Sequence, residues 1–314
     1  MTCTHCNGET KKFGKDRKGN QRFRCLSCNK TFIAQVEKPL GKMTLSMDKA
    51  LMCMRLLVEG NSIRSIERIT GVEKSTILSL LETVGQKCET LLDRLIQGVS
   101  VKDVQLDELV GFVGMKQRTA KRLGKQNEAV GDAWCFVAIE QTSKLILAWH
   151  LGRRTMRDTF TFTEKLGRAT AGNFQVNTDG MPAYRDAVIE SLGTRVDFAQ
   201  IVKVFGKPEG EEHRYASPEV IEMIKTSVLG RPNLAKATTS HIERQNLTIR
   251  MGMRRMTRLT NGFSKKFENL RYAYALHFAY YNFCRIHSTL RCTPAMEAGV
   301  TKSVWSLKDL LTAV

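Results

Sequence analysis

The stretch that decides the fold is VQLDELVGFV, residues 104–113. Its apolar residues are spaced as in a β-strand rather than a helix. Asp107 stands in the middle of the stretch among apolar neighbours, where a carboxylate is costly unless it is paired or bound to a metal. Because side chains alternate along a strand, we expect Glu108 to point to the opposite face and to stay out of a site built on Asp107.

Strand and helix patterns continue after this stretch. A fourth strand is predicted to end at Asp179-Gly180, and Pro182 opens the helix that follows. Three antiparallel strands followed by alternating helix and strand predict an α/β fold with a mixed sheet and flanking helices. The second strand, the third strand, the first helix and the fourth strand are predicted at residues 133–139, 144–151, 155–170 and 174–178.

Three acids stand where carboxylates perform chemistry. Asp179 follows a strand at its carboxyl end, which is a common place for functional residues in α/β sheets, although Asp-Gly there can also be only a turn. Residues 239–250, TSHIERQNLTIR, predict a helix with one acid, Glu243. Together with Asp107 these acids suit two Mg²⁺ or Mn²⁺ ions. Two such metal ions activate water or a 3′-hydroxyl for in-line attack on a phosphate.

Four of the nine cysteines crowd into the first 28 residues. They form two C-x2-C pairs separated by 18 residues, which is the spacing of a zinc ribbon. A redox motif would need a single pair in a thioredoxin-like context. About thirty residues bury too little core to fold alone, so the zinc would be structural. The predicted ligands are Cys3, Cys6, Cys25 and Cys28.

A helical region follows the cysteines. Three helices are predicted at residues 44–59, 63–69 and 74–84, with a linking helix at 88–97. The glycine-containing turn before the third helix is typical of a helix-turn-helix, which would direct the start of that helix at the major groove. A plain helical bundle has the same spacing. The residues expected to face DNA are Lys74, Ser75 and Thr76.

The charge of the chain indicates its partners. Forty-nine basic and 31 acidic residues give a formal net charge of +18. This balance favours nucleic acid over an anionic membrane, because the sequence has no basic amphipathic helix with a bulky aromatic face. No apolar run has the length of a membrane span, and no signal peptide is visible at the N-terminus, so we expect a cytoplasmic protein.

Several motifs carry a resemblance to a known family. They are Leu106-Asp107-Glu108, residues 178–184 (TDGMPAY), residues 241–247 (HIERQNL) and the tail at residues 281–295. In order and spacing they resemble bacterial insertion-sequence transposases of the DDE class, and the insertion-sequence-one-like group most closely. The zinc ribbon and the helix-turn-helix match this group as well, and the resemblance covers almost the whole chain.

The resemblance implies a ribonuclease-H-like catalytic domain in which Asp107, Asp179 and Glu243 hold the metal ions. It also implies a basic residue seven positions after the glutamate, which Arg250 matches. The partners would be double-stranded DNA, both the terminal inverted repeats and the target, bound by a homo-oligomer. The arginines expected to hold the strand are Arg244, Arg250, Arg254, Arg255 and Arg258.

The expected division is a zinc ribbon at 1–36, a helix-turn-helix domain at 44–98 and the catalytic domain at 100–300. Two other functions remain open: a non-catalytic DNA-binding regulator with the same N-terminal modules, and a nuclease that cuts without joining. The stretch 196–239 is longer than in compact family members, and its elements are not predicted. Within it, Glu209–Glu212 is expected to be a solvated loop, with His213 exposed.

Overall fold

The computed structural model describes residues 1–17, 19–33, 39–125, 127, 129–206 and 220–313. The chain forms two compact units, Met1–Met43 and Thr44–Val314. The three-part division of the sequence therefore stays a prediction about which segments act separately. The expected solvated loop at Glu209–Glu212 and His213 lies outside the described residues.

The first unit is a small antiparallel sheet of three strands, β1 (Thr10–Lys15), β2 (Gln21–Cys25) and β3 (Thr31–Ile33). Its apolar cover includes Phe23 stacked on Phe32, with the ring centroids 6.2 Å apart. Most other side chains of these strands are exposed or only partly buried. So little buried surface agrees with a unit that needs a bound metal to fold.

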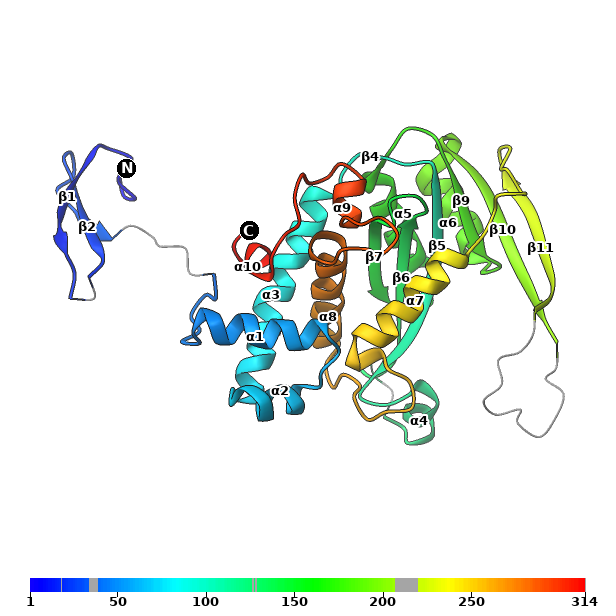
Figure 1. Ribbon diagram of the computed structural model, residues 1–314, viewed down its shortest axis with the longest axis horizontal. Coiled ribbons are helices and arrows are strands. Elements are labelled where there is room, and N and C mark those ends of the chain that lie inside the picture. Colours follow the sequence, from blue (N-terminus) through cyan, green and yellow to red (C-terminus); the bar gives the residue numbers. More distant parts are fainter. Residues whose placement is uncertain (18, 34–38, 126, 128, 207–219, 314) are drawn as a thin grey trace. The chain divides into compact units, whose positions relative to one another are not determined.

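The second unit is built on a six-stranded sheet in the order β11-β10-β9-β5-β6-β7 (Figure 1). Strand β6 is antiparallel to its neighbours β5 and β7, β9 and β10 run parallel to β5, and β11 is antiparallel to β10. The predicted mixed α/β sheet is confirmed. The strands are β5 (Asp103–Val113), β6 (Gly131–Glu140), β7 (Ile146–Gly152), β9 (Phe174–Asp179), β10 (Val196–Phe205) and β11 (Val220–Leu229).

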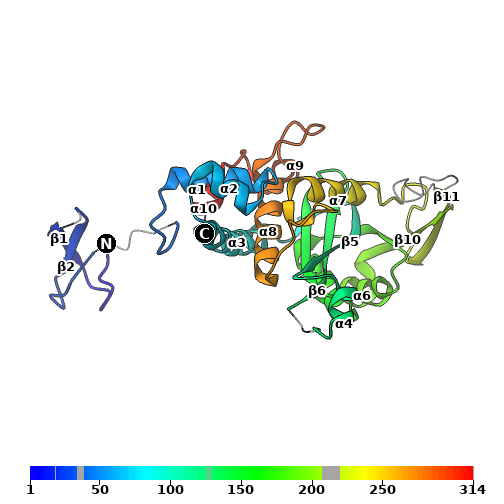
Figure 2. The ribbon, with the colours of Figure 1, turned by 90° about the horizontal axis from the view of Figure 1, so that it is seen from below.

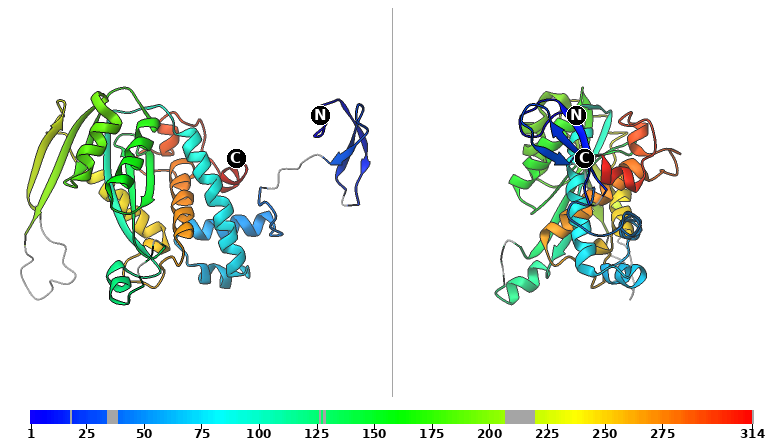
Figure 3. Two further views of the ribbon diagram at one scale, coloured as in Figure 1. Left: turned by 180° about the vertical axis from the view of Figure 1, so that it is seen from behind. Right: turned by 90° about the vertical axis from the view of Figure 1, so that its left-hand side faces the viewer.

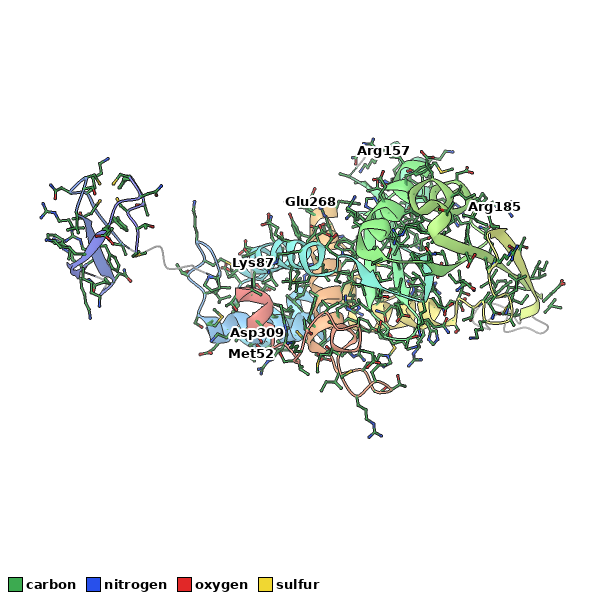
Figure 4. The ribbon with its side chains drawn as sticks, turned by 90° about the horizontal axis from the view of Figure 1, so that it is seen from above. Met52, Lys87, Arg157, Arg185, Glu268 and Asp309 are labelled. Carbon is green, nitrogen blue, oxygen red and sulfur yellow. The ribbon has the colours of Figure 1, made fainter. Side chains whose placement is uncertain are left out.

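Helices cover both faces of this sheet. Figure 2 shows α6 (Ala183–Leu192) on one face and α7 (Ser240–Gly252) on the other. Helix α5 (Met156–Ala169) packs beside α6, where Thr163 Oγ1 lies 2.8 Å from Ser191 Oγ. Arg185, labelled in Figure 4, ties α6 to β10 by donating from Nε to Gln200 Oε1 over 2.7 Å.

The helical region of the second unit contains α1 (Met47–Val58), α2 (Ile63–Thr70) and α3 (Lys74–Leu95). Ser46 and Ser62 cap the first two helices through their side chains. Gly71 ends α2 in the left-handed conformation, at φ +68°, which glycine adopts without strain. Helices α2 and α3 are therefore joined by a short turn that contains a glycine, as the sequence predicts.

The predicted break between a third helix and a linking helix is wrong, because α3 runs through it unbroken. Gly85 lies at the predicted break, where α3 packs against α8 (Phe267–Ala279). A Cβ on Gly85 would stand only 2.3 Å from the Cβ of Tyr272. This glycine therefore permits a close helix crossing and does not end the helix. Figure 3 shows α3 and α8 side by side.

Helix α8 joins the helical region to the sheet. Its Tyr274 and Phe278 pack on Trp149 of β7, with ring centroids 6.3 and 5.5 Å away. The π-helix η3 (Tyr280–Cys284) continues it, followed by α9 (Pro294–Glu297) and α10 (Leu307–Thr312). Lys87 of α3 donates to the Leu311 carbonyl in α10, and Figure 4 labels Lys87 near Asp309. The shorter elements are β4 (Val99–Ser100), α4 (Gln117–Arg122), β8 (Thr170–Ala171), η1 (Gly193–Arg195) and η2 (Arg254–Met256).

The stretch without predicted elements supplies the edge of the sheet and the return to α7. Strands β10 and β11 pair as a hairpin, and the chain then crosses the sheet. The backbone N–H of Asn233 attaches this segment to β9 by donating to Gln175 Oε1 over 2.7 Å. Leu234 packs on Ala199 and Ile201. In the part of the chain that the structure describes, no helix is both long and apolar enough to cross a membrane.

Candidate functional site

The register between β5 and β9 brings the first two acids level. The last paired residues of these parallel strands are Leu106 and Thr178, so Asp107 and Asp179 come next on either side. Strand β9 ends at Asp179, whose Oδ1 accepts a hydrogen bond from the Met181 N–H over 3.0 Å. The carboxylates therefore meet at the carboxyl end of β9, where the chain turns away and leaves room between them.

Glu108 belongs to the same cluster, and the expectation that it stays out of the site is wrong. One oxygen from each of Asp107, Glu108 and Asp179 lies within 4.8 Å of the other two. Asp107 turns along the strand, since its Oδ1 accepts from the Glu108 N–H over 2.8 Å. Because β9 stops at this level, the edge of β5 away from β6 is open, and both side chains reach it.

Basic and phenolic groups hold Glu108 in place. Its carboxylate is nearly buried and pairs with Arg154, whose Nη2 lies 2.6 Å from Oε1. The other oxygen accepts from the Tyr184 hydroxyl of α6 over 3.2 Å. Burial and the charge of Asp179 raise the pKa of Glu108, against the opposing effect of Arg154. The cluster thus carries more negative charge than its neighbours neutralise.

The pKa of Asp107 is strongly raised. Burial raises its pKa to about 7, helped by the charges of Glu108, Asp179 and Glu243. Desolvated carboxylates at such distances cannot all ionise without a compensating cation. Three carboxylates, which are hard oxygen donors, form the ligand set that Mg²⁺ or Mn²⁺ takes in proteins. The residues present therefore fit a divalent metal site.

Helix α7 is fixed on β5 beside this cluster by two polar contacts. The buried Gln105 accepts from the backbone N–H groups of His241 and Ile242 with its Oε1, over 2.9 and 3.1 Å. One turn further along, Asn246 Nδ2 donates to Asp107 Oδ2 over 2.7 Å. Gln105 and Asp107 are two residues apart on one strand, so the start of α7 runs alongside it.

Glu243 lies in the first turn of α7, between these two contacts. Its Oε1 accepts from Thr239 Oγ1 over 2.6 Å and pairs with Lys203 Nζ of β10. Its side chain is 45% exposed. Glu243 is not in the set of oxygens that lie within 4.8 Å of one another, although its charge raises the pKa of Asp107. The structure thus places the third predicted acid beside the cluster, held by Lys203.

The predicted DNA-binding arginines differ in their surroundings. Arg244 and Arg258 are exposed. Arg250 is partly buried and donates to the Met256 carbonyl over 3.4 Å, and burial lowers its pKa. Arg255 donates to Ser264 Oγ over 2.9 Å. Arg254 is partly exposed, and at the start of α3 Lys74 and Ser75 are exposed and Thr76 is partly buried.

The four N-terminal cysteines converge as the sequence predicts. Their sulfurs all lie within 4.8 Å of one another. Cys3 and Cys28 are 3.6 Å apart, and Cys6 and Cys25 are 3.4 Å apart, measured between Sγ atoms. These separations are far too long for disulfides. They are close to the ~3.8 Å between two sulfurs of a tetrahedral site with Zn–S bonds of about 2.3 Å.

The backbone around the cysteines favours metal binding. Asn7 and Asn29 each follow a second cysteine and adopt φ +56°, which turns the chain sharply after the ligand. The Cys28 N–H approaches Cys25 Sγ to 3.4 Å. Hydrogen bonds from the N–H groups of Cys28 and Ser27 lower the pKa of Cys25 to about 6 and so favour the thiolate that zinc binds, whereas the neighbouring thiols raise the pKa of Cys6 to about 12. The donor set fits a structural zinc ion.

Sequence reasoning missed four residues of the acidic site: Glu108, Gln105, Asn246 and Lys203. Asn246 had a usable signal, because it follows Glu243 by three positions and so lies on the same helical face. Glu108, next to Asp107, was judged only by strand alternation, and Gln105, two residues before Asp107, was given no role. Lys203 lies in the stretch whose elements were not predicted. No model of a known protein family matches this sequence, and no curated protein matches it either.

Proposed function

We propose that this protein is a DNA transposase of the DDE class. The observation that carries the proposal is the convergence of Asp107, Glu108 and Asp179 at one strand end, with Glu243 held beside them by the docking of α7 on β5. Burying several carboxylates without compensating charge reduces the stability of the folded protein. Metal-dependent phosphoryl transfer is a reaction that needs such carboxylates as metal ligands.

The arrangement of the sheet supports a ribonuclease-H-like core. Three antiparallel strands followed by alternating helix and strand are expected for it, and β5, β6 and β7 are followed by α5, β9, α6 and β10. In this order β11 is an addition at the sheet edge, between β10 and the helix that carries Glu243.

The acids would hold the metal ions, two per site. When bound, Mg²⁺ or Mn²⁺ activates the attacking oxygen and stabilises the leaving oxygen at a phosphodiester. Asp107 would lose its proton to this binding, and Asn246 would keep its carboxylate oriented. Asn246 Oδ1 is buried without a hydrogen-bond partner in the described structure, so it offers a further oxygen at the site. Glu243 would leave its ion pair with Lys203 and bind a metal ion.

The remaining modules would deliver DNA. The zinc ribbon and the start of α3, with Lys74, Ser75 and Thr76, would bind the terminal inverted repeats. Arg244, Arg250, Arg254, Arg255 and Arg258 would hold the strand, and binding would weaken steeply with salt. The freed 3′-hydroxyl would then attack target DNA. A homo-oligomer would be needed, because both ends of one element are cut together.

The test is an end-cleavage assay with purified protein, Mg²⁺ and a duplex that carries the inverted repeats flanking its gene. Wild type is expected to nick at the repeat boundary and to leave a 3′-hydroxyl. Asp107→Asn, Asp179→Asn and Glu243→Gln should abolish the nick and keep DNA binding. Asp186→Asn is the matched control, since Asp186 is an exposed acid in the first turn of α6.

Each other outcome identifies a different function. Specific binding of wild type without any nick would favour the non-catalytic regulator. Nicking without joining of the 3′-hydroxyl to a second duplex would favour a nuclease. Cleavage that survives all three acid substitutions would show that the acidic cluster is not the active site.

A further inference from the structure

A cleft of about 730 Å³ lies away from the acids, between the helical region and the segment that joins α7 to α8. The end of α1 meets the end of α7 here, as a Cβ on Gly60 would stand 3.0 Å from the Met251 carbonyl oxygen. Figure 1 shows the ends of α7 and α8 beside α1 and α2. The volume is within the roughly 300–1,000 Å³ of small-molecule sites.

The charge of the lining is one-sided. No aspartate or glutamate is among the described residues that line the cleft. Cations concentrated without acids attract an anion, and guanidinium groups suit the geometry of phosphate. The basic residues of the lining are Arg64, Lys74, Arg254, Arg255 and Lys265.

Two polar side chains in this lining have buried nitrogen atoms without a hydrogen-bond partner in the described structure. His277 is 4% exposed, and neither ring nitrogen has a hydrogen-bond partner in the described structure. Arg255 binds Ser264, but its buried Nη2 has no partner among the described residues. Leaving such groups unsatisfied is costly. A ligand that offers both an anionic oxygen and neutral donor or acceptor groups would satisfy them.

The protonation states of these two groups match such a ligand. Burial lowers the pKa of Arg255 to about 10, so its guanidinium remains charged at neutral pH. Burial and the charge of Arg285 lower the pKa of His277 to about 4, so its imidazole is neutral there. A neutral imidazole offers one donor and one acceptor, which a nucleobase edge or a sugar hydroxyl can pair with.

Part of the cleft lining is apolar, and we call it the leucine wall. Leu57, Leu78 and Leu81 come from α1 and α3, and Leu276 from α8. Inorganic phosphate would make no contact that needs these side chains, whereas a planar base could pack on the partly exposed Leu57 and Leu78. Asn61, Asn261 and Asn269 add amide groups, which can bind base edges.

We propose that this cleft binds one nucleotide, with its phosphate on Arg255 and Arg254 and its base against the leucine wall. Two sources have this chemistry: a free nucleotide, and a nucleotide extruded from bound DNA. Lys74 and Ser62, at the starts of the two helix-turn-helix helices, line the same cleft. The lining alone supports this site, which does not depend on the proposed transposase activity.

The test measures binding to the full-length, zinc-loaded protein without added Mg²⁺ or Mn²⁺, so that no cleavage is involved. One arm titrates dAMP, dCMP, dGMP and dTMP calorimetrically, with inorganic phosphate for comparison. The other arm follows the fluorescence of 2-aminopurine in the last or next-to-last position of a short duplex, which rises when the base leaves the stack. Binding in the first arm identifies a free nucleotide, and a rise only in the second identifies an extruded one.

Two variants keep the proposal falsifiable. Arg255→Met removes a buried charge and should weaken nucleotide binding about 10–100-fold, as expected for lost charge-assisted hydrogen bonds. Ala273→Phe, which keeps every cation, should fill the cleft. Arg157→Met, an exposed arginine of α5 that does not line the cleft, is the control and should change binding less than about threefold.

Three results would overturn the proposal. The first is that neither free nucleotides nor the 2-aminopurine duplexes give a signal. The second is that phosphate binds as tightly as the nucleotides, because the apolar wall would then have no role. The third is that Arg255→Met and Ala273→Phe both bind like wild type while remaining folded by circular dichroism.

Discussion

Asn246 Nδ2 of α7 lies 2.7 Å from Oδ2 of Asp107 in β5, and this bond aligns the helix with the acidic cluster. Together with the bonds from His241 and Ile242 to Gln105, it sets the height of α7 along the strand. Glu243 is three residues before Asn246 on the same helical face. Two neutral amides, Gln105 and Asn246, therefore set the height of the helix that carries the third acid, and Lys203 holds its carboxylate.

Asn246→Ala is expected to reduce metal affinity and DNA cleavage by about 10–100-fold, as is usual for groups that orient a metal ligand. The physical reason is the loss of the bond that fixes Asp107 and α7. Mn²⁺ titration and the end-cleavage assay check it. Thr248→Ala on the same helix is the control, since the Thr248 hydroxyl donates to the Arg244 carbonyl of its own helix. Equal activity of the two variants would contradict the positioning role.

Glu108→Gln should impair divalent metal binding to a similar degree as Asp179→Asn. The amide keeps the size of the side chain and its contacts with Tyr184, but it removes the charge that a metal needs. Arg154→Gln is the comparison, because it breaks the ion pair and keeps the carboxylate. If Arg154→Gln weakens metal binding and Glu108→Gln does not, Glu108 serves only to pair with Arg154.

Metal affinity should depend on pH around neutrality. The pKa of Asp107 is raised to about 7 in the metal-free protein, so this carboxyl must lose a proton before it can bind metal. Below pH 7 the apparent affinity should fall by up to about tenfold per pH unit. Mn²⁺ titrations between pH 5.5 and 8.5 measure this, and a flat profile would show that Asp107 is not a ligand.

The same shift predicts how stability changes with pH. A raised pKa stabilises the folded state below the ordinary value of the group, and this contribution is lost as the pH rises through about 7. Mg²⁺ or Mn²⁺ should therefore increase the melting temperature more at pH 8 than at pH 5.5. Asp107→Asn, which cannot ionise, should remove most of this difference. A metal-induced shift that is equal at both pH values would contradict the assignment.

Lys203→Met should strengthen divalent metal binding modestly. Lys203 pairs with Glu243 and holds this acid away from the other three carboxylates. An ion pair this exposed is worth up to about 1 kcal/mol, so the affinity should rise by no more than about fivefold. Calorimetry with Mn²⁺ measures it, and Lys225→Met in the neighbouring strand is the control. A weaker affinity would mean that Lys203 supports the site instead.

Zinc content tests the N-terminal unit separately. Wild type should hold one zinc per chain, and Cys25→Ser should lose it, because the unit has little core to fold around without metal. Cys292→Ser, far along the chain in sequence, should keep a full zinc content. Metal analysis by mass spectrometry gives the ratio. One zinc per chain in Cys25→Ser would show that the ribbon site is wrong.

The sequence predicts those parts of this molecule whose signals are local. The strand at 104–113, the end of a strand at Asp179 and the two cysteine pairs each carry a pattern within a few residues, and the structure has all of them. The joining of β10 and β11 into a hairpin was not predictable in this way. Strand pairing depends on partners far apart in sequence, and the edge strands here have many exposed apolar residues.

The errors in the site have a common cause. Alternation along a strand assigns Glu108 to the far face. On the β9 side of β5, however, strand pairing ends at Leu106 and Thr178, so side chains from both faces can meet at this open edge. The unbroken course of α3 also depends on packing, because Gly85 lies in close contact with Tyr272 of α8. In both places long-range packing decided the outcome.

The most direct test of the central claim is strand transfer. A duplex that carries the inverted repeat, with a label on the strand that ends in the free 3′-hydroxyl, is incubated with protein, Mg²⁺ and a supercoiled plasmid. The amount of label joined to the plasmid is then measured. The account predicts joining by wild type and by Asp186→Asn, and none by Asp107→Asn or Asp179→Asn. Joining by either of these two variants at the wild-type rate would contradict it.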